Sequence, residues 1–220
     1  MDGTREWDIS FKDSYIKPYM TDFGPRNDLL WNAYIPAGWT SDEQFAYLAV
    51  QTSNAELPYP GYDALFRLDL STGKLTPTLK PAIGHLTTDY VFRFSPGGSQ
   101  LAYVNQNVLP LRIVIYNLAS GTEQSFSLDG TFGQAGSFLW SPDEKQLVFA
   151  AGDSIGDSVI LFDLVTMKNE YLVKDSAHTY LPRAWAGDTS LYSQDYPSGW
   201  VYLDTQTKTI TPAPAPTPMP

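Results

Sequence analysis

The chain has 220 residues, of which 43% are hydrophobic and 14% aromatic, with no cysteine and a formal net charge of −10. This composition is typical of a folded globular protein, and it excludes disulfides, cysteine-ligated zinc and thiol nucleophiles. The acidic balance, with no cluster of Lys or Arg, argues against nucleic acid and anionic membrane surfaces as partners. No apolar run of about 18 residues occurs, so membrane insertion is not expected.

The first predicted element lies at residues 6–11, where Trp7, Ile9 and Phe11 alternate with polar residues. Alternation with a period of two predicts a half-buried strand. Two placements are open: the strand closes the array against its last repeat, or it belongs to the outer hairpin of a truncated earlier repeat. In both cases residues 1–30 form an N-terminal strand segment.

Four similar runs follow, each with an aromatic residue, a polar turn and a short apolar strand. They are WTSDEQFAYL (39–48), FSPGGSQLAY (94–103), WSPDEKQLVF (140–149) and the weaker WAGDTSLYS (185–193). A second anchor follows each run, at Asp69, Asn117, Asp163 and Asp204. Both anchors recur at intervals of about 41–54 residues, which is the period of four-stranded propeller blades. We therefore divide residues 31–210 into repeats at about 31–82, 83–130, 131–177 and 178–210.

Two classes of hairpin turn are predicted inside each repeat. The Ser-Pro segments at 95–98 and 141–144 form one class, because Pro suits the second position of a turn. Residues 71–74 and 119–122 form the second class, with Gly where a positive φ is required. The Asp or Asn that recurs before this second turn is expected to bond its own backbone, which is a local role rather than a catalytic one.

The predicted core comes from the apolar strands of the middle repeats. Runs such as residues 113–116 and 159–162 are apolar on successive positions, which indicates strands covered on both faces. The side chains expected to be buried are Phe94, Leu101, Tyr103, Ile113, Ile115, Trp140, Leu147, Phe149, Ile160 and Phe162. No long helix is expected, because no window has a sustained period of 3.6 residues.

The runs at 94–103 and 140–149 resemble the core motif of TolB-like, WD-repeat-like propeller repeats: an aromatic residue, Ser-Pro-Asp-Gly, a polar pair and an apolar strand. The motif departs at Gly97 and at Glu144, and the first and last repeats lack its Pro. The resemblance implies an all-β, β-propeller-like fold of about four blades of four antiparallel strands, either complete or part of a larger ring. It also implies a bacterial periplasmic or extracellular location, with the cytoplasm as the alternative.

No motif for catalysis, metal binding or phosphate binding is present. The chain has only two histidines, too few for a histidine-based metal site. The acidic loop at residues 153–158 could offer Asp153 and Asp157 to calcium, but its spacing differs from that of known calcium loops, and a solvated turn is favoured. We therefore predict no catalytic residue, no metal and no cofactor.

The candidate site comes from blade geometry. The loops between the second and third strands and the connections between blades share one face, and here they are long: 51–63, 105–112, 151–158 and 194–199. Aromatic and polar residues on this face form the predicted ligand-binding set: Tyr59, Tyr62, His85, Tyr90, Arg112, His178, Tyr180, Arg183 and Tyr196. The leading hypothesis is a non-enzymatic binding or scaffolding module for a protein or glycan.

Two other functions stay open. The chain could be an accessory domain that gates or positions substrate for a separate catalytic domain, or a hydrolase or lyase with a site in the central channel. The last predicted segment, residues 211–220, alternates Pro with small residues and is expected to be an extended tail or linker.

Overall fold

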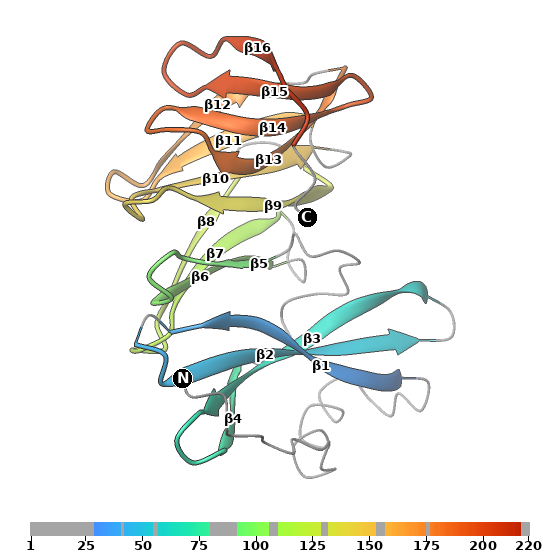
Figure 1. Cartoon of the computed structure of the whole chain (residues 1–220), viewed down its shortest axis with the longest axis vertical. Helices are drawn as coiled ribbons and strands as arrows, with labels where there is room; N and C mark the ends of the chain where they lie inside the picture. The colour runs from blue at the N-terminus through green and yellow to red at the C-terminus, as the bar shows by residue number, and fades with distance from the viewer. Residues whose placement is uncertain are drawn as a thin grey trace. The chain divides into compact units, whose positions relative to one another are not determined.

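The computed structural model describes residues 29–40, 42–54, 57–79, 92–105, 110–128, 132–152, 157–174 and 177–216. These residues form sixteen β-strands and no helix. The strands make four antiparallel sheets of four strands each, ordered within every sheet as they follow along the chain (Figure 1). The all-β expectation is confirmed. The predicted strand at residues 6–11 lies outside the described residues.

Two compact units divide the chain, residues 1–87 and residues 88–220. The first unit holds one sheet, made of β1 (Leu29–Trp39), β2 (Phe45–Asn54), β3 (Leu57–Asp69) and β4 (Leu75–Leu79).

The second unit holds three sheets that pack on one another in chain order. The sheet nearest the start contains β5 (Phe92–Phe94), β6 (Gln100–Asn105), β7 (Arg112–Asn117) and β8 (Glu123–Ser127). The middle sheet contains β9 (Gln134–Trp140), β10 (Gln146–Gly152), β11 (Ser158–Asp163) and β12 (Lys168–Val173). The last sheet contains β13 (Thr179–Trp185), β14 (Ser190–Tyr196), β15 (Gly199–Asp204) and β16 (Ile210–Ala213).

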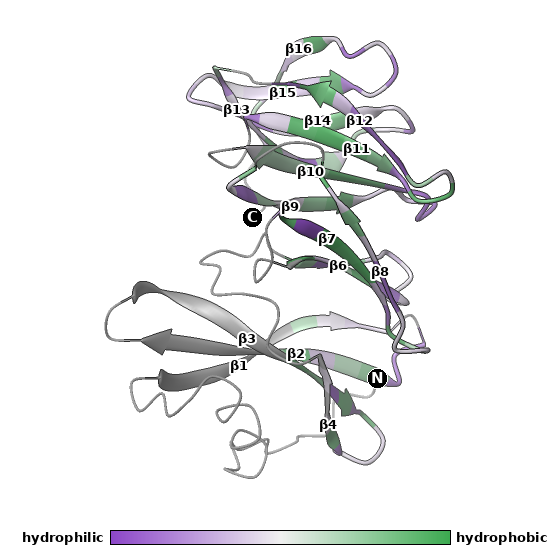
Figure 2. Cartoon of the chain, turned by 180° about the vertical axis from the view of Figure 1, so that it is seen from behind, coloured by the Kyte–Doolittle hydropathy of each residue, from purple (hydrophilic) through white to green (hydrophobic). Residues whose placement is uncertain are grey.

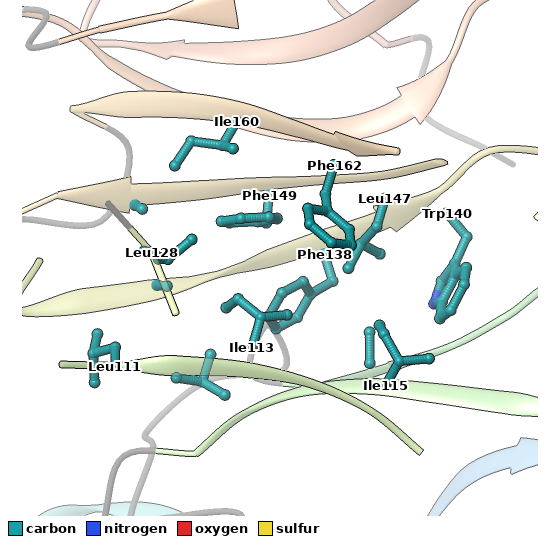
Figure 3. Close-up of a cluster of buried hydrophobic side chains, with 14 residues drawn as sticks. Leu111, Ile113, Ile115, Leu128, Phe138, Trp140, Leu147, Phe149, Ile160 and Phe162 are labelled. Carbon is teal, nitrogen blue, oxygen red and sulfur yellow. The ribbon is translucent and has the colours of Figure 1, made fainter. Parts of the chain in front are cut away.

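A large buried cluster lies between the β5–β8 sheet and the middle sheet (Figure 3). Leu147 and Phe149 of β10 pack with Ile160 and Phe162 of β11, and all four are almost fully buried. Phe162 stacks on Phe126 of β8 with ring centroids 3.6 Å apart. Alternate residues of β10 and β11 therefore face the β5–β8 sheet.

The other face of the middle sheet is also buried. Val148, Val159 and Leu161 form a second cluster with side chains of the last sheet, among them Leu191 and Leu203. Figure 2 shows the hydrophobic colouring along β10 and β11 that this double burial requires. Covering on both faces explains why these strands are apolar at successive positions.

Nine of the ten predicted core residues are buried. The exception is Phe94, which is only half-buried. Phe94 is the last residue of the short strand β5, whereas Trp140, at the same place in the middle sheet, is buried.

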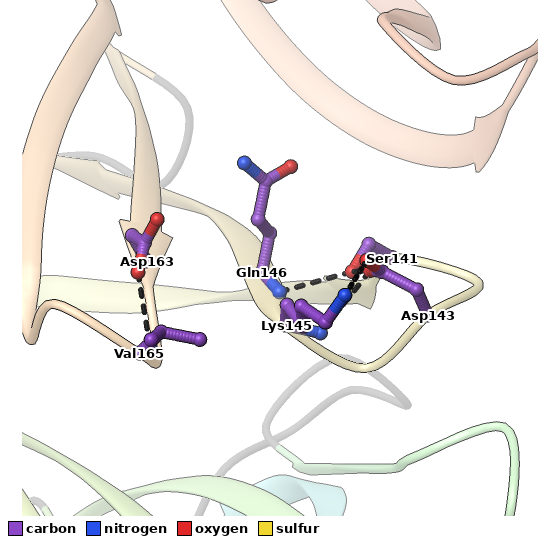
Figure 4. A network of polar contacts seen from close by, with 6 residues as sticks. All are labelled: Ser141, Asp143, Lys145, Gln146, Asp163 and Val165. Atoms are coloured by element: carbon purple, nitrogen blue, oxygen red, sulfur yellow. Dashed lines mark hydrogen bonds and ion pairs between the residues drawn. The ribbon is translucent and has the colours of Figure 1, made fainter.

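The first class of hairpin turn is closed by a hydroxyl group. The Ser141 hydroxyl accepts the backbone N–H of Gln146 at 2.9 Å and donates to Asp143 at 2.7 Å (Figure 4). Ser95 accepts the N–H of Gln100 in the same way, and Thr40 accepts that of Phe45. The turn therefore forms in the first repeat even though its Pro is missing.

The second class of turn is closed by the recurring Asp or Asn. One side-chain oxygen of Asp163 accepts the N–H groups of Val165 at 2.9 Å and Thr166 at 2.7 Å. The same pair of bonds, two and three residues ahead, is made by Asp69, Asn117 and Asp204. The predicted local role of these residues is confirmed.

A positive φ is required four residues after each of these anchors. Gly73 and Gly121 supply it in the first two repeats, both with φ of 70°. Met167 and Lys208 hold the position in the other two, with φ of 57° and 59°. The backbone geometry is the same in all four turns, but in two of them a side chain raises the conformational free energy of the positive φ.

Two of the predicted long loops are wrong. Residues 51–63 are mostly strand, because β2 and β3 stay paired out to Asn54 and Leu57. Register shifts along this hairpin accommodate a stretch with two prolines that would interrupt a regular ladder. Likewise, β14 continues to Tyr196 and β15 begins at Gly199, which leaves a tight turn in place of a loop over residues 194–199.

The predicted tail also differs in its first residues. Thr211, Pro212 and Ala213 belong to β16 and pair with β15, Pro212 lying opposite Val201. Pro is tolerated because β16 is the edge strand of its sheet, so one side of its backbone needs no ladder partner.

Leu147→Ala tests the double-sided core. Leu147 has no exposed surface, so truncation should lower the free energy of unfolding by ~2–5 kcal/mol in urea titrations. Val165→Ala is the matched control, because Val165 is 70% exposed and its truncation should change stability by less than ~0.5 kcal/mol. Equal effects of the two variants would contradict the packing described.

Met167→Gly should stabilise the protein by up to ~1 kcal/mol, because Gly removes the cost of a side chain at positive φ. Thr166→Gly, one residue earlier and outside the positive-φ set, should destabilise by ~0.4–1 kcal/mol through the entropy of the unfolded chain. Thermal unfolding of both variants tests this opposition of signs, and a shift in the same direction would refute it.

The turn aspartates predict a specific acid sensitivity. Hydrogen bonds from Ser71 and the neighbouring backbone lower the pKa of Asp69 to about 2, and the backbone N–H of Thr166 lowers the pKa of Asp163. A carboxyl whose pKa is lowered by folding stabilises the folded state above its unfolded pKa, and this contribution disappears as the pH falls through the folded value.

Asp163→Asn keeps the acceptor oxygen but cannot titrate. The free energy of unfolding of this variant should therefore fall less steeply than that of the wild type between pH 5 and pH 2, as measured by urea titration. Asn117→Asp is the reverse change at the equivalent turn and should steepen the fall. Identical slopes for all three proteins would show that the turns do not stabilise the ionised form.

Candidate recognition site

In each sheet, the turn after the second strand and the start of the first strand lie at the same end of the strands. This end of the sheet is called its edge here. In the last sheet Thr179 pairs with Tyr196 and Tyr180 pairs with Asp195, so the start of β13 lies beside the β14–β15 turn. The middle sheet has the same arrangement, with Gln134 paired to Gly152. In these two sheets the start of the first strand therefore lies beside the turn after the second strand, and in the last sheet this brings His178 close to Tyr196.

A buried carboxylate holds the exposed histidine at this edge. Asp195 Oδ1 lies 2.9 Å from His178 Nδ1, and the side chains are 7% and 47% exposed respectively. The His178 ring stacks on Tyr180, with centroids 6.0 Å apart and an interplanar angle of 13°. Burying a carboxylate is costly unless it is hydrogen-bonded, so His178 stabilises Asp195 while Asp195 orients the ring.

Asp195 occupies a position that is apolar in the preceding repeat. The pairs Leu147–Trp140 and Leu191–Trp185 align the two sheets, and they place Ser193 at the position of Phe149 and Asp195 at that of Ala151. Ser193 is fully buried, and its hydroxyl has no hydrogen-bond partner within the described residues.

The tryptophans at the ends of β9 and β13 differ in the hydrogen bonding of their ring N–H groups. Trp140 donates its ring N–H to the carbonyl of Arg93 at 3.0 Å, whereas the equivalent N–H of Trp185 is buried without a partner in the part of the chain that the structure describes. Ser193 and Asp195 therefore put polar groups at two core positions between the middle and last sheets, whereas Trp185 lies at the other end of β13 from His178.

The other predicted site residues are more scattered. Tyr180 and Arg183 are strand residues of β13 rather than loop residues; Tyr180 is buried, and Arg183 donates to Gln194 Oε1 at 2.8 Å. Arg112 is exposed at the start of β7, on another sheet, and Tyr196 is 49% exposed.

The remaining predicted residues cannot be placed with their side chains. Tyr59 and Tyr62 belong to β3, and their side chains lie outside the description, as do His85, Tyr90 and the acidic loop at 153–156. Within the described residues no group of three or more His, Asp or Glu could hold a metal ion.

The His178 cluster differs from a hydrolytic relay. Ser198 Oγ lies 3.5 Å from His178 Nδ1, the same ring nitrogen that contacts Asp195. A Ser-His-Asp triad needs the serine and the aspartate on opposite ring nitrogens, so that the proton can pass through the ring. This geometry orients an imidazole at the surface and does not activate Ser198.

Sequence reasoning missed Asp195 and Ser193. The available signal was a contrast between repeats: LVFAA in β10 against LYSQD in β14 at the same register.

No family profile and no curated protein matches this chain. Solved structures do match it. TolB from Acinetobacter baumannii is 19% identical, with a TM-score of 0.53 over 74% of this chain and 40% of its own. An oligogalacturonate lyase from Vibrio parahaemolyticus is 12% identical, with a TM-score of 0.58 over 86% of this chain and 54% of its own. Nidogen, solved in complex with laminin, is 9% identical, with a TM-score of 0.51 over 81% of this chain and 78% of its own.

These likenesses show the fold, which is that of a TolB-like β-propeller with blades of four antiparallel strands. The chain spans 40% of TolB and 54% of the lyase. In the described part of the chain, no helix has the length and hydropathy needed to span a membrane.

Proposed function

We propose that this chain is a non-enzymatic binding module, whose protein or glycan ligand contacts the edge of the last sheet that carries His178 and Tyr196. The observation that supports this most directly is the replacement of apolar core positions by Ser193 and Asp195 beneath this edge. Polar groups at core positions lower stability, and such a cost is typical of sites that serve function.

The chemistry of the edge suits recognition. Tyr196 presents a half-exposed aromatic ring, and His178 presents an imidazole whose orientation is set by Asp195. Aromatic rings with a few fixed polar groups are typical of the central residues of binding interfaces. We also propose a periplasmic or extracellular location, as the family resemblance implies.

The second candidate is an accessory domain that positions substrate for a separate catalytic domain. The chain aligns with only part of TolB and of the lyase, so sheets arranged in this way also occur within longer chains. The sequence of the full native reading frame distinguishes the two candidates. A catalytic domain beside this one would favour the accessory role.

Tyr196→Ser should weaken ligand binding at least tenfold while leaving the melting temperature unchanged, because Tyr196 is exposed and its loss opens no core. The ligand is first selected by exposing the purified chain to a glycan array and to immobilised peptide libraries, and its affinity is then measured by calorimetry. Val165→Ser is the matched control: Val165 is exposed in the β11–β12 turn, at the opposite edge of the neighbouring sheet.

Two results would reject the proposal. Equal loss of affinity in the Tyr196 and Val165 variants would place the ligand elsewhere. A lyase or hydrolase activity of the purified chain that disappears in His178→Gln would make the site catalytic.

A further inference from the structure

The outer face of the last sheet differs in chemistry from that of the middle sheet. Leu191 and Leu203 point toward the middle sheet, so the alternate residues Tyr192 and Tyr202 lie on the opposite, outer face. At the equivalent positions the middle sheet has Val148 and Leu161, which are buried against the last sheet.

Three aromatic rings on this face form a connected group, named here the aromatic strip: Tyr192, Trp200 and Tyr202. Tyr192 stacks on Trp200 with centroids 4.8 Å apart and an interplanar angle of 6°, and it contacts Tyr202 at 5.7 Å. All three are half-buried, and two of them carry a hydroxyl. The equivalent face of the middle sheet packs against its neighbour with aliphatic side chains, which have no such hydroxyl groups.

The chain itself already contacts this strip. The last pair between β15 and β16 joins Trp200 to Ala213, and the Tyr192 hydroxyl donates a hydrogen bond of 2.6 Å to the carbonyl of Pro214, the next residue. Tyr192 is on β14, two strands in from β16, so its ring must extend over Trp200 to reach that carbonyl. In Figure 1 the chain leaves β16 and turns back across the ends of β15 and β14.

The sequence beyond Ala213 is suited to this contact. The ladder between β15 and β16 ends at Ala213, and Pro214 and Pro216 beyond it have no N–H to donate. Alternating Pro favours the polyproline II conformation, whose carbonyls have no internal partners and are free to accept bonds from a receptor. Aromatic-lined surfaces with hydroxyl or ring N–H donors are the known means of binding such segments.

Charge also favours this occupant. Residues 211–220 contain no charged side chain, whereas the whole chain carries a net charge of −10. A neutral segment can lie against an acidic protein without repulsion. Because the segment is joined directly to β16, its effective concentration at the strip is far above that of any separate chain.

We propose that the aromatic strip is a docking surface for polyproline II, and that its occupant is the chain's own segment at residues 214–216. The strip takes an extended, uncharged, proline-rich peptide through ring contacts and the Tyr192 hydroxyl. The segment thereby lies against the aromatic strip, and its release exposes the strip to a proline-rich segment of another chain.

Backbone relaxation by NMR on the full chain tests the proposal, because Ala215 supplies an amide signal between two prolines. Its order parameter should be close to those of the sheets, at about 0.8, in the wild type. Tyr192→Phe removes only the donor and should bring it below about 0.6. Tyr196→Phe is the matched control: it removes a hydroxyl from the same face of β14, away from Pro214, and should leave the order parameter of Ala215 unchanged.

A second measurement does not depend on that variant. A synthetic peptide of residues 211–220 should shift the ring signals of Tyr192 and Trp200 in a full-length Pro214→Ser/Pro216→Ser variant, and shift them at least tenfold less in the wild type, whose own segment competes.

Three results would overturn the proposal. The first is low order at Ala215 in the wild type. The second is equal binding of the peptide to both proteins. The third is order at Ala215 that is lost on dilution, which would make the occupant a second copy of the chain.

Discussion

Burial of the middle sheet on both faces is the interaction on which the second unit depends. Leu147 and Phe149 join it to one neighbour, and Val148 joins it to the other. This arrangement lowers the specificity with which strand register is selected. In a strand with one polar face, a slip of one residue would expose the apolar side chains, but here either register buries apolar residues on both sides.

The turns supply the missing specificity. The Ser141 hydroxyl bonds Gln146 at one end of the β9–β10 pair, and the Asp163 carboxylate closes the β11–β12 turn. Each turn fixes the positions at which its two strands begin and end, and thereby which residues lie opposite one another. Core and turns therefore have separate tasks in this fold: the apolar strands provide the free energy of packing, and the polar turn residues select the register in which it is gained.

The turns and the core could be predicted from the sequence because both depend on local patterns. Asp69 and its equivalents act within three residues, and residues 159–162 are apolar whatever they contact. The candidate site could not be predicted in the same way. The role of Asp195 depends on its alignment with Ala151 of the preceding sheet and on its distance to His178, and neither is a local pattern. The β2–β3 hairpin differs from the loop predicted over residues 51–63, because the register shifts that let these strands stay paired are visible only in the structure.

The closure of each Asp or Asn turn by its own side chain has a consequence for how such a chain can change over generations. Asp163 needs no residue from any other sheet to form its turn, and Asn117 does the same without a charge. A repeat that is copied within a gene therefore already contains the residue that closes its own turn. Only the residues at the faces between sheets must then adapt, and the pair Phe149 and Ser193 shows how far that adaptation can go while the backbone pattern persists.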